Sequence, residues 1–249
     1  MFDTIFASDL DNTLIYSYKV KTEGDICVEQ RGGKELSFMS VASFNLLQEV
    51  NRKCLFLPVT TRSVEQYTRV ALLSGGGPEF AIVSNGGNLL RNGAIDKAWQ
   101  DETYAAIDGC ALKMNQYIAL LREDEKINFD IRLIDGMFIF TKSSDIDATA
   151  ALLRGAVDER FDLLTTNDKL YIIPKVINKG AAVARFRKMF PCERVFCAGD
   201  RDMDLSMLLY SDLAFVPSDY NFHSCNFNFH KGPPTSFGLF VLANVLKLL

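Results

Sequence analysis

Short apolar runs separated by amphipathic stretches set the pattern of the first part of the chain. Residues 5–8, 54–59 and 80–83 are such runs, and each is typical of a strand buried on both faces. Between them, in 40–50 and 64–71, apolar side chains recur three or four residues apart, which predicts amphipathic helices. Strand and helix therefore alternate, and this alternation predicts a Rossmann-like, doubly wound parallel sheet.

The pattern changes in the middle of the chain. There the sequence predicts two short strands around Asn92-Gly93, a long helix over 104–121, a hairpin turning at Asp135-Gly136, a helix over 146–157 and a second hairpin turning at Asn167-Asp168. Helices followed by paired strands favour an antiparallel sheet with helices on one face. We therefore expect an α+β (αββαββ) domain over 88–176, inserted into an α/β core formed by 1–87 and 177–249.

The alternating pattern returns after Asn178. A helix is expected from there to Met189, followed by strands over 195–198 and 213–216, with a helix over 205–210 between them and a closing helix over 237–248. Residues 16–35 show little period and predict an irregular stretch or a short hairpin.

Composition narrows the class of protein. The chain has 249 residues, a net charge of −4 and no basic surplus, so we expect no nucleic-acid partner. Its N-terminal apolar run is far too short to span a bilayer, so we expect no membrane partner. The six cysteines form no C-x-x-C pair and are expected to be buried thiols in a reducing, cytoplasmic setting. His223, Cys225 and His230 lie in an aromatic stretch, FHSCNFNFH, for which packing of Phe222, Phe227 and Phe229 is favoured over a metal site.

Acidic residues follow two of the predicted strands. Asp9 and Asp11 come directly after residues 5–8, and a second acidic loop, with Asp200, Asp202 and Asp204, follows residues 195–198. A parallel sheet brings such loops to one edge, where ligands bind. A single helix cap would need only one acid, whereas clustered carboxylates need a counter-charge. Their hard oxygens suit Mg²⁺, which is commonly held by one or two carboxylates together with substrate phosphate.

Two further residues suit a phosphorylated substrate. Thr60 ends another predicted strand and offers a hydroxyl donor, while Lys179 lies just before a helix and offers a fixed cation for a phosphoryl group. An Asp carboxylate can itself take the phosphoryl group as a nucleophile. The residues thus predict a metal-assisted phosphoryl-transfer site.

Four motifs in this order resemble those of the haloacid dehalogenase superfamily of phosphatases. They are DLDNT (9–13), the strand-ending Thr60, Lys179, and GDRDMD (199–204). The inserted domain is similar to the C2B cap of the Cof-like branch, which includes sucrose-phosphate phosphatase and phosphomannomutase. Met203 and Thr61 differ from this pattern, because the family usually has Asn and Gly at these positions.

The resemblance implies a role for each matching residue. Asp9 would be the nucleophile and Asp11 the general acid and base, while Thr60 and Lys179 would hold the phosphoryl group. Mg²⁺ would be bound by Asp9, the backbone carbonyl of Asp11, Asp200 and Asp204. Substrate contacts are expected from Thr60, Thr61, Arg62, Asn85 and Lys179, although Arg62 equally suits a salt bridge, Asn85 a tight turn and Asp202 a solvated loop.

The sequence therefore predicts a Mg²⁺-dependent phosphatase that hydrolyses a small phosphorylated metabolite, with a sugar phosphate favoured, through an aspartyl-phosphate intermediate. A phosphomannomutase-like phosphotransferase and a catalytically weak regulatory protein that binds phosphorylated metabolites are the alternatives. A monomer or homodimer is expected.

Overall fold

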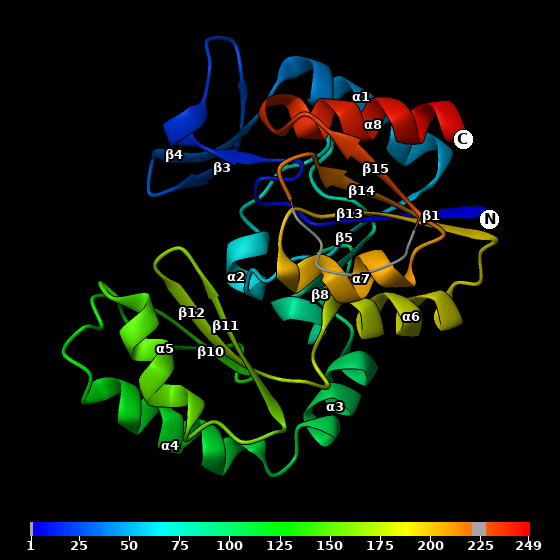
Figure 1. Cartoon of the computed structure of the whole chain (residues 1–249). Coiled ribbons are helices and arrows are strands. Elements are labelled where there is room, and N and C mark those ends of the chain that lie inside the picture. The colour runs from blue at the N-terminus through cyan, green and yellow to red at the C-terminus, as the bar shows by residue number, and fades with distance from the viewer. Residues whose placement is uncertain (1, 221–227) are drawn as a thin grey trace. The chain divides into compact units, whose positions relative to one another are not determined.

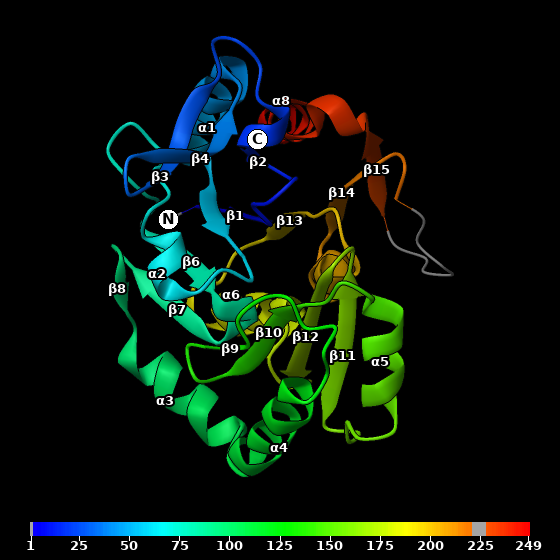
Figure 2. The same ribbon diagram turned by 90° about the vertical axis from the view of Figure 1, so that its left-hand side faces the viewer.

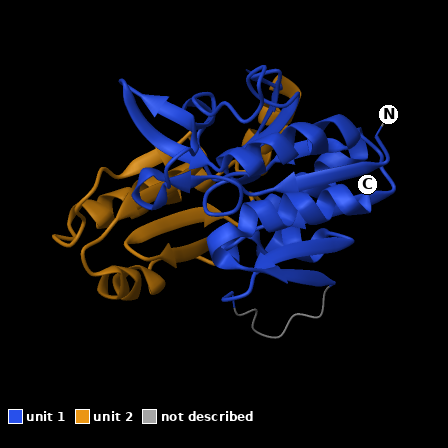
Figure 3. Cartoon of the chain, turned by 90° about the horizontal axis from the view of Figure 1, so that it is seen from above, with its two compact units in different colours: residues 1–96, 178–249 blue, residues 97–177 orange. Residues whose placement is uncertain are grey.

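The computed structural model describes residues 2–220 and 228–249, which form two compact units. The first comprises residues 1–96 and 178–249, and the second comprises residues 97–177 (Figure 3). The first unit extends to residue 96 rather than ending at 87, because β7 (Asn88–Arg91) pairs along the whole of β6 (Phe80–Val83) and β8 (Ala94–Ile95) continues that sheet.

A parallel sheet forms the centre of the first unit, as predicted. Its order is β15-β14-β13-β1-β5, and every neighbouring pair is parallel. A bridge between Val59 and Ile82 places β6 beside β5 in the same direction. The five strands are β1 (Thr4–Ser8), β5 (Leu55–Pro58), β13 (Arg194–Ala198), β14 (Leu213–Pro217) and β15 (Phe229–Gly232).

Helices cover both faces of this sheet. Helices α1 (Val41–Lys53) and α8 (Phe237–Leu248) lie together on one face, and α6 (Lys179–Met189) and α7 (Leu205–Tyr210) lie on the other (Figure 1). Strands β1, β13 and β14 are almost wholly buried, which explains their continuous apolar character. Short 3₁₀ turns, η2 (Ser84–Gly86), η3 (Asp202–Asp204) and η4 (Pro234–Ser236), link these elements.

A glycine at the start of α6 allows α7 to approach closely. A Cβ atom at position 180 would overlap the backbone carbonyl of Ser206, so only glycine fits there. The Gly180 amide donates instead to the Ser206 hydroxyl, at 3.0 Å. This contact holds Lys179, the residue before Gly180, close to the loop that precedes α7.

A small antiparallel sheet follows the first strand. It has the order β2-β4-β3 and consists of β2 (Tyr16–Ser17), β3 (Ile26–Arg31) and β4 (Lys34–Met39), with a 3₁₀ turn, η1 (Tyr18–Val20), after β2. The β3–β4 hairpin shortens the helix predicted over 64–71, and α2 spans only Val64–Tyr67. It ends there because the Ala71 amide donates to the Val28 carbonyl of β3 rather than to its own helix.

The second unit confirms the predicted succession of a helical segment and a hairpin, twice over. Its antiparallel sheet has the order β11-β12-β10-β9, and α4 and α5 pack against it (Figure 2). The long helix predicted over 104–121 is interrupted because Gly109 adopts a left-handed conformation, with φ of 79°. The elements are α3 (Lys97–Ala106), α4 (Cys110–Arg122), β9 (Arg132–Ile134), β10 (Phe138–Lys142), α5 (Ile146–Arg154), β11 (Phe161–Thr166) and β12 (Lys169–Pro174).

Two predictions made from composition concern particular segments. Within the described residues, no helix combines the length and hydrophobicity needed to cross a bilayer. In the aromatic stretch, Phe222, His223, Cys225 and Phe227 lie outside the described residues, while His230 belongs to β15 and packs edge-on against Phe215 of β14.

Candidate active site

The carboxyl ends of three neighbouring strands form the base of the site. Ser8, the last residue of β1, is in register with Ala198 of β13 and Pro58 of β5. The Asp9 amide donates to the Ala198 carbonyl at 2.9 Å, and the Val59 amide donates to the Ser8 carbonyl at 2.8 Å. Asp9 and the loops after β13 and β5 therefore emerge at one edge of the sheet, which is the edge where ligands bind in open α/β folds.

A buried lysine lies between two of the predicted acids. The Lys179 Nζ atom is 2.5 Å from Asp9 Oδ1 and 2.6 Å from Asp204 Oδ1, and only 1% of Lys179 is exposed. Burial alone would lower the pKa of Lys179, but the Asp204 and Asp9 carboxylates raise it above its ordinary value. Lys179 is thus a fixed cation beside Asp9.

Three buried carboxylates could share a metal ion. Asp9, Asp200 and Asp204 each offer an oxygen within 4.8 Å of the others, and the Thr13 hydroxyl lies 3.4 Å from both Asp9 Oδ2 and Asp200 Oδ1. Burial, followed by repulsion from Asp204, raises the pKa of Asp200 to about 7. Burial raises the pKa of Asp9 well above its ordinary value, against the opposing effect of Lys179. A hard divalent cation would relieve this repulsion, so the residues present fit Mg²⁺.

Asp204 also shapes the loop that carries Asp200. Its Oδ2 atom accepts hydrogen bonds from the amides of Asp200 and Arg201, each at 3.0 Å, while its Oδ1 atom holds Lys179. A Cβ atom at position 199 would overlap the Asp204 side chain, so the loop requires glycine there. Lys179 is therefore oriented by Asp204 and Asp9, although Met203 departs from the motif that this loop resembles.

The Asp11 side chain lies apart from the acid cluster, and its partner is Arg62. Arg62 Nε and Nη2 donate to the two Asp11 oxygens, each at 2.8 Å, and Nη1 donates to buried Glu29, also at 2.8 Å. Arg62 was expected either to contact substrate or to form a salt bridge. Its guanidinium, on a side chain only 12% exposed, forms ion pairs with two carboxylates of the protein itself.

The remaining predicted substrate residues lie after β5 and β6. Thr60 is fully buried and its hydroxyl accepts the Arg62 amide hydrogen at 3.2 Å, while its carbonyl accepts that of Asn85 at 3.0 Å. Asn85 is buried in a turn with φ of 58°, and Thr61 is half-buried. Thr60 and Asn85 are thus brought together by the backbone.

Sequence reasoning missed three contributors to these contacts. Thr13 belongs to the DLDNT motif, but it was given no role of its own. Glu29 lies in the stretch that showed no period, and Arg201 is one charged residue within an acidic loop. The side-chain contacts of these three residues depend on the folded chain.

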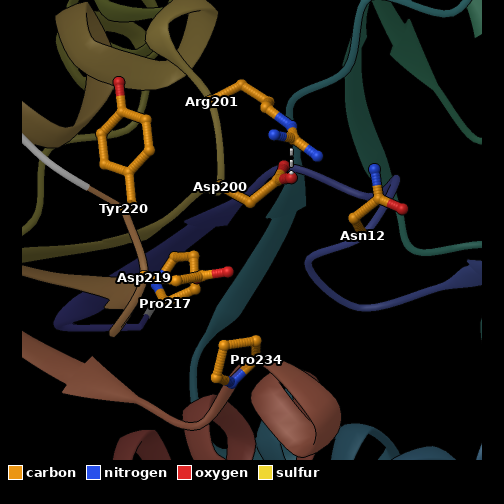
Figure 4. Close-up of a pocket in the computed structure, with 7 residues that line it drawn as sticks. All are labelled: Asn12, Asp200, Arg201, Pro217, Asp219, Tyr220 and Pro234. Atoms are coloured by element: carbon orange, nitrogen blue, oxygen red, sulfur yellow. Dashed lines mark ion pairs between the residues drawn. The ribbon is translucent and has the colours of Figure 1, made fainter. Parts of the chain in front are cut away.

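A hollow of about 190 Å³ opens beside the acid cluster. The Arg201 Nε atom donates to Asp200 Oδ2 at 2.9 Å at its edge (Figure 4). Asp202, for which a solvated role was favoured, accepts a hydrogen bond from the Tyr220 hydroxyl. The residues that line the hollow are Asn12, Asp200, Arg201, Pro217, Asp219, Tyr220 and Pro234.

Comparisons with known proteins extend this description. No family model and no curated protein sequence matches the chain. Among solved structures, the sucrose-phosphatase of Synechocystis, in complex with sucrose and phosphate, matches with a TM-score of 0.67 and 14% identity over 98% of each chain. The C-terminal domain of C. albicans trehalose-6-phosphate phosphatase matches with a TM-score of 0.67 and 13% identity, over 99% of this chain and 92% of that one.

A third match spans both units as well. TM0651 from Thermotoga maritima has a TM-score of 0.60 and 15% identity, over 98% of this chain and 97% of that one. At these identities the likeness establishes the fold. The chain therefore shares the fold of these solved structures, with an α/β core and an inserted α+β unit.

Proposed function

We propose that this protein is a Mg²⁺-dependent phosphatase that hydrolyses a small phosphorylated metabolite, with sugar phosphates as the favoured class. The observation that carries the proposal is the environment of Asp9, a buried carboxylate at the end of the central strand. A fixed cation lies 2.5 Å from it, and two further buried acids lie within metal-sharing distance. The solved structures of similar fold include two sugar-phosphate phosphatases by name, which supports this substrate class.

In the first half-reaction, an Asp9 oxygen attacks the substrate phosphorus and the bond from phosphorus to the leaving oxygen breaks. Lys179 neutralises charge beside the attacking carboxylate, and Asp11 protonates the leaving oxygen. Both Asp11 oxygens are held by Arg62 in this structure, so proton donation requires at least one of these contacts to open.

In the second half-reaction, Asp11 accepts a proton from water as the water oxygen attacks phosphorus. The bond between phosphorus and Asp9 then breaks, which releases inorganic phosphate and restores the Asp9 carboxylate. Asp9, Asp200, Asp204 and the backbone carbonyl of Asp11 are the groups proposed to hold Mg²⁺. The ion would neutralise the transferring phosphoryl group and the acids around it.

A panel of phosphorylated metabolites tests this proposal directly. Purified protein should release phosphate from at least one sugar phosphate in the presence of Mg²⁺, without a bisphosphate activator, and EDTA should abolish the release. The need for no activator separates hydrolysis from phosphomutase chemistry.

The matched control is Asp9→Asn, which preserves the size of the side chain but removes the nucleophile. Phosphate release that survives in this variant, or activity that persists after EDTA treatment, contradicts the proposed site. A protein that binds phosphorylated metabolites but releases phosphate from none of them supports the regulatory alternative instead.

We also propose a cytoplasmic location. The cysteines within the described residues, Cys27, Cys54, Cys110, Cys192 and Cys197, are free thiols, which is usual for proteins of a reducing compartment.

A further inference from the structure

Arg201, in the acidic loop 199–204, forms an ion pair with one of the carboxylate oxygens that a metal ion would need. The Arg201 Nε atom lies 2.9 Å from Asp200 Oδ2, while Asp200 Oδ1 lies 3.4 Å from the Thr13 hydroxyl. Asp200 is a member of the buried acid cluster, with 6% of the residue exposed. A cation that binds Asp200 must therefore compete with the Arg201 guanidinium for this carboxylate.

Arg201 differs from Lys179, the other cation of the cluster, in its freedom to move. Lys179 is enclosed and holds two acids, whereas 48% of the Arg201 side chain is exposed. The hollow of about 190 Å³ lies next to the Arg201–Asp200 pair (Figure 4). The guanidinium can thus turn toward solvent when a cation takes its place, but opening the pair costs more than opening one exposed on both sides, because the Asp200 side chain is only 6% exposed.

The charges of the cluster indicate how Arg201 affects the binding of a metal ion at Asp200. Three carboxylates face two cations, Lys179 and Arg201, so their formal sum is already close to neutral before a divalent ion arrives. Arg201 lowers the negative potential that attracts a metal, and its bond to Asp200 must be broken. Both effects weaken metal binding, because like charges a few ångströms apart repel even in a water-like dielectric.

We propose that Arg201 is an internal competitor of the metal ion that holds the Mg²⁺ affinity of the site below what its three acids would otherwise provide. Arg201 acts here through Asp200 and is a positioning residue, not a catalytic one. The consequence is a site that fills at higher Mg²⁺ concentrations and exchanges its ion more readily. This inference rests on the proposed Mg²⁺-dependent function.

Calorimetric titration of Mg²⁺ into the full-length, EDTA-treated protein tests the inference without substrate. Arg201→Gln removes the charge but keeps a polar side chain, and its Kd for Mg²⁺ should fall on the order of tenfold. Arg201→Lys keeps the charge and should stay within about threefold of the wild type. Arg52→Gln changes the net charge by the same amount, but at an exposed position of α1 that is distant in sequence from Arg201. This control variant should leave the Kd for Mg²⁺ unchanged.

Each remaining outcome overturns the inference in a distinguishable way. An Arg201→Gln variant that binds Mg²⁺ as weakly as the wild type, or more weakly, shows that Arg201 does not compete. Equal tightening in Arg52→Gln shows a general effect of net charge. Absence of Mg²⁺ binding by both the wild type and Arg201→Gln overturns the proposed metal site itself, and this inference falls with it.

Discussion

Asp9 and Asp11 are two residues apart, yet their environments differ sharply. Asp9 is buried between Lys179 and the acid cluster, whereas the Asp11 side chain is about half exposed and paired with Arg62. A nucleophile needs a fixed position beside its counter-charge, and a proton carrier needs access to the leaving group and water. The environments therefore match the different roles proposed for the two acids.

Substitution of each acid should separate these roles. Asp9→Asn should lower turnover at least about a thousandfold and form no covalent phosphoryl-enzyme, because the nucleophilic oxygen is lost. Asp11→Asn should slow turnover by about 10²- to 10⁴-fold but still become phosphorylated by an aryl phosphate, whose leaving group needs little protonation. Single-turnover incorporation of labelled phosphate measures the difference. Equal loss of phosphoryl-enzyme in both variants would contradict the division of roles.

The buried acid Asp200 should make the stability of the metal-free protein depend on pH. Its pKa is about 7 in the folded state, against an ordinary value of 3.8. Between these values the folded state retains a proton that the unfolded state has lost. The contribution of Asp200 to the free energy of unfolding in EDTA should therefore be most favourable below about pH 4. It should decrease as the pH rises toward 7.

Urea unfolding at about pH 5 and about pH 8 measures this dependence. In Asp200→Asn the free energy of unfolding should depend less steeply on pH, since the asparagine side chain does not titrate. Asp9 contributes in the same direction, because its pKa is also raised. Addition of Mg²⁺ should restore stability most at the higher pH, where protons no longer compete for the acids. A slope that is unchanged in Asp200→Asn would contradict this assignment.

At the scale of elements, the β3–β4 hairpin is linked to Asp11, in the loop after β1, through the ion pairs of Arg62. Glu29 of β3 is 4% exposed and binds Arg62 at 2.8 Å, Arg69 at 3.2 Å and the Ser37 hydroxyl at 2.6 Å. Arg62 in turn holds both oxygens of Asp11. The hairpin therefore helps to position the proposed proton carrier.

Glu29→Gln should leave Arg62, and through it Asp11, less well positioned, and so impair proton transfer more than binding. The expected result is a loss of kcat with a sugar phosphate about tenfold greater than the loss with an aryl phosphate, whose good leaving group needs less help from Asp11. KM should change little. Steady-state kinetics with both substrates provide the measurement.

Glu35→Gln is the matched control for this prediction. It makes the same chemical change on β4 of the same hairpin, where Glu35 forms an exposed pair with Lys21, at 3.3 Å. It should leave both substrates unaffected. If Glu29→Gln slows the two substrates equally, the buried acid serves the stability of the hairpin and not the position of Asp11.

At the scale of the whole molecule, the chain divides its residues between two kinds of unit. The groups proposed for chemistry, Asp9, Asp11, Thr60, Lys179, Asp200 and Asp204, all belong to the α/β unit, while residues 97–177 form a separate antiparallel unit. We propose that this second unit selects among substrates, because binding the remote parts of a substrate positions it for transfer.

Replacement of residues 97–177 by a short Gly/Ser linker tests this division of labour. The junctions follow the compact units, so β7 and β8 stay with the core. The shortened protein should still bind Mg²⁺ and slowly hydrolyse an aryl phosphate, but should lose its preference among sugar phosphates. Circular dichroism and cooperative unfolding first confirm that the core is folded, and a kcat/KM panel then gives the answer. An unchanged order of preference would place specificity in the α/β unit.

Much of the architecture followed from local sequence patterns. Buried parallel strands appear as continuous apolar runs and amphipathic helices as a three-to-four period, so the alternating core and the paired hairpins could be predicted before the fold was known. The acids of DLDNT and GDRDMD come directly after such runs, and the rule that parallel strands end at one edge places them together. This is why the acids of the two loops were expected at one edge, and the structure groups three of them, Asp9, Asp200 and Asp204.

Contacts between distant segments decided the rest. The helix after Ser63 ends early because its chain pairs with β3, and the boundary between units moves to residue 96 because β7 pairs with β6. Arg62 turns to Asp11 and Glu29 because the fold places two carboxylates within its reach. The spacing of apolar residues indicates only which face of each helix or strand is buried. Which side chains meet across segments is set by their packing, and so only the tertiary structure revealed the partners of Arg62.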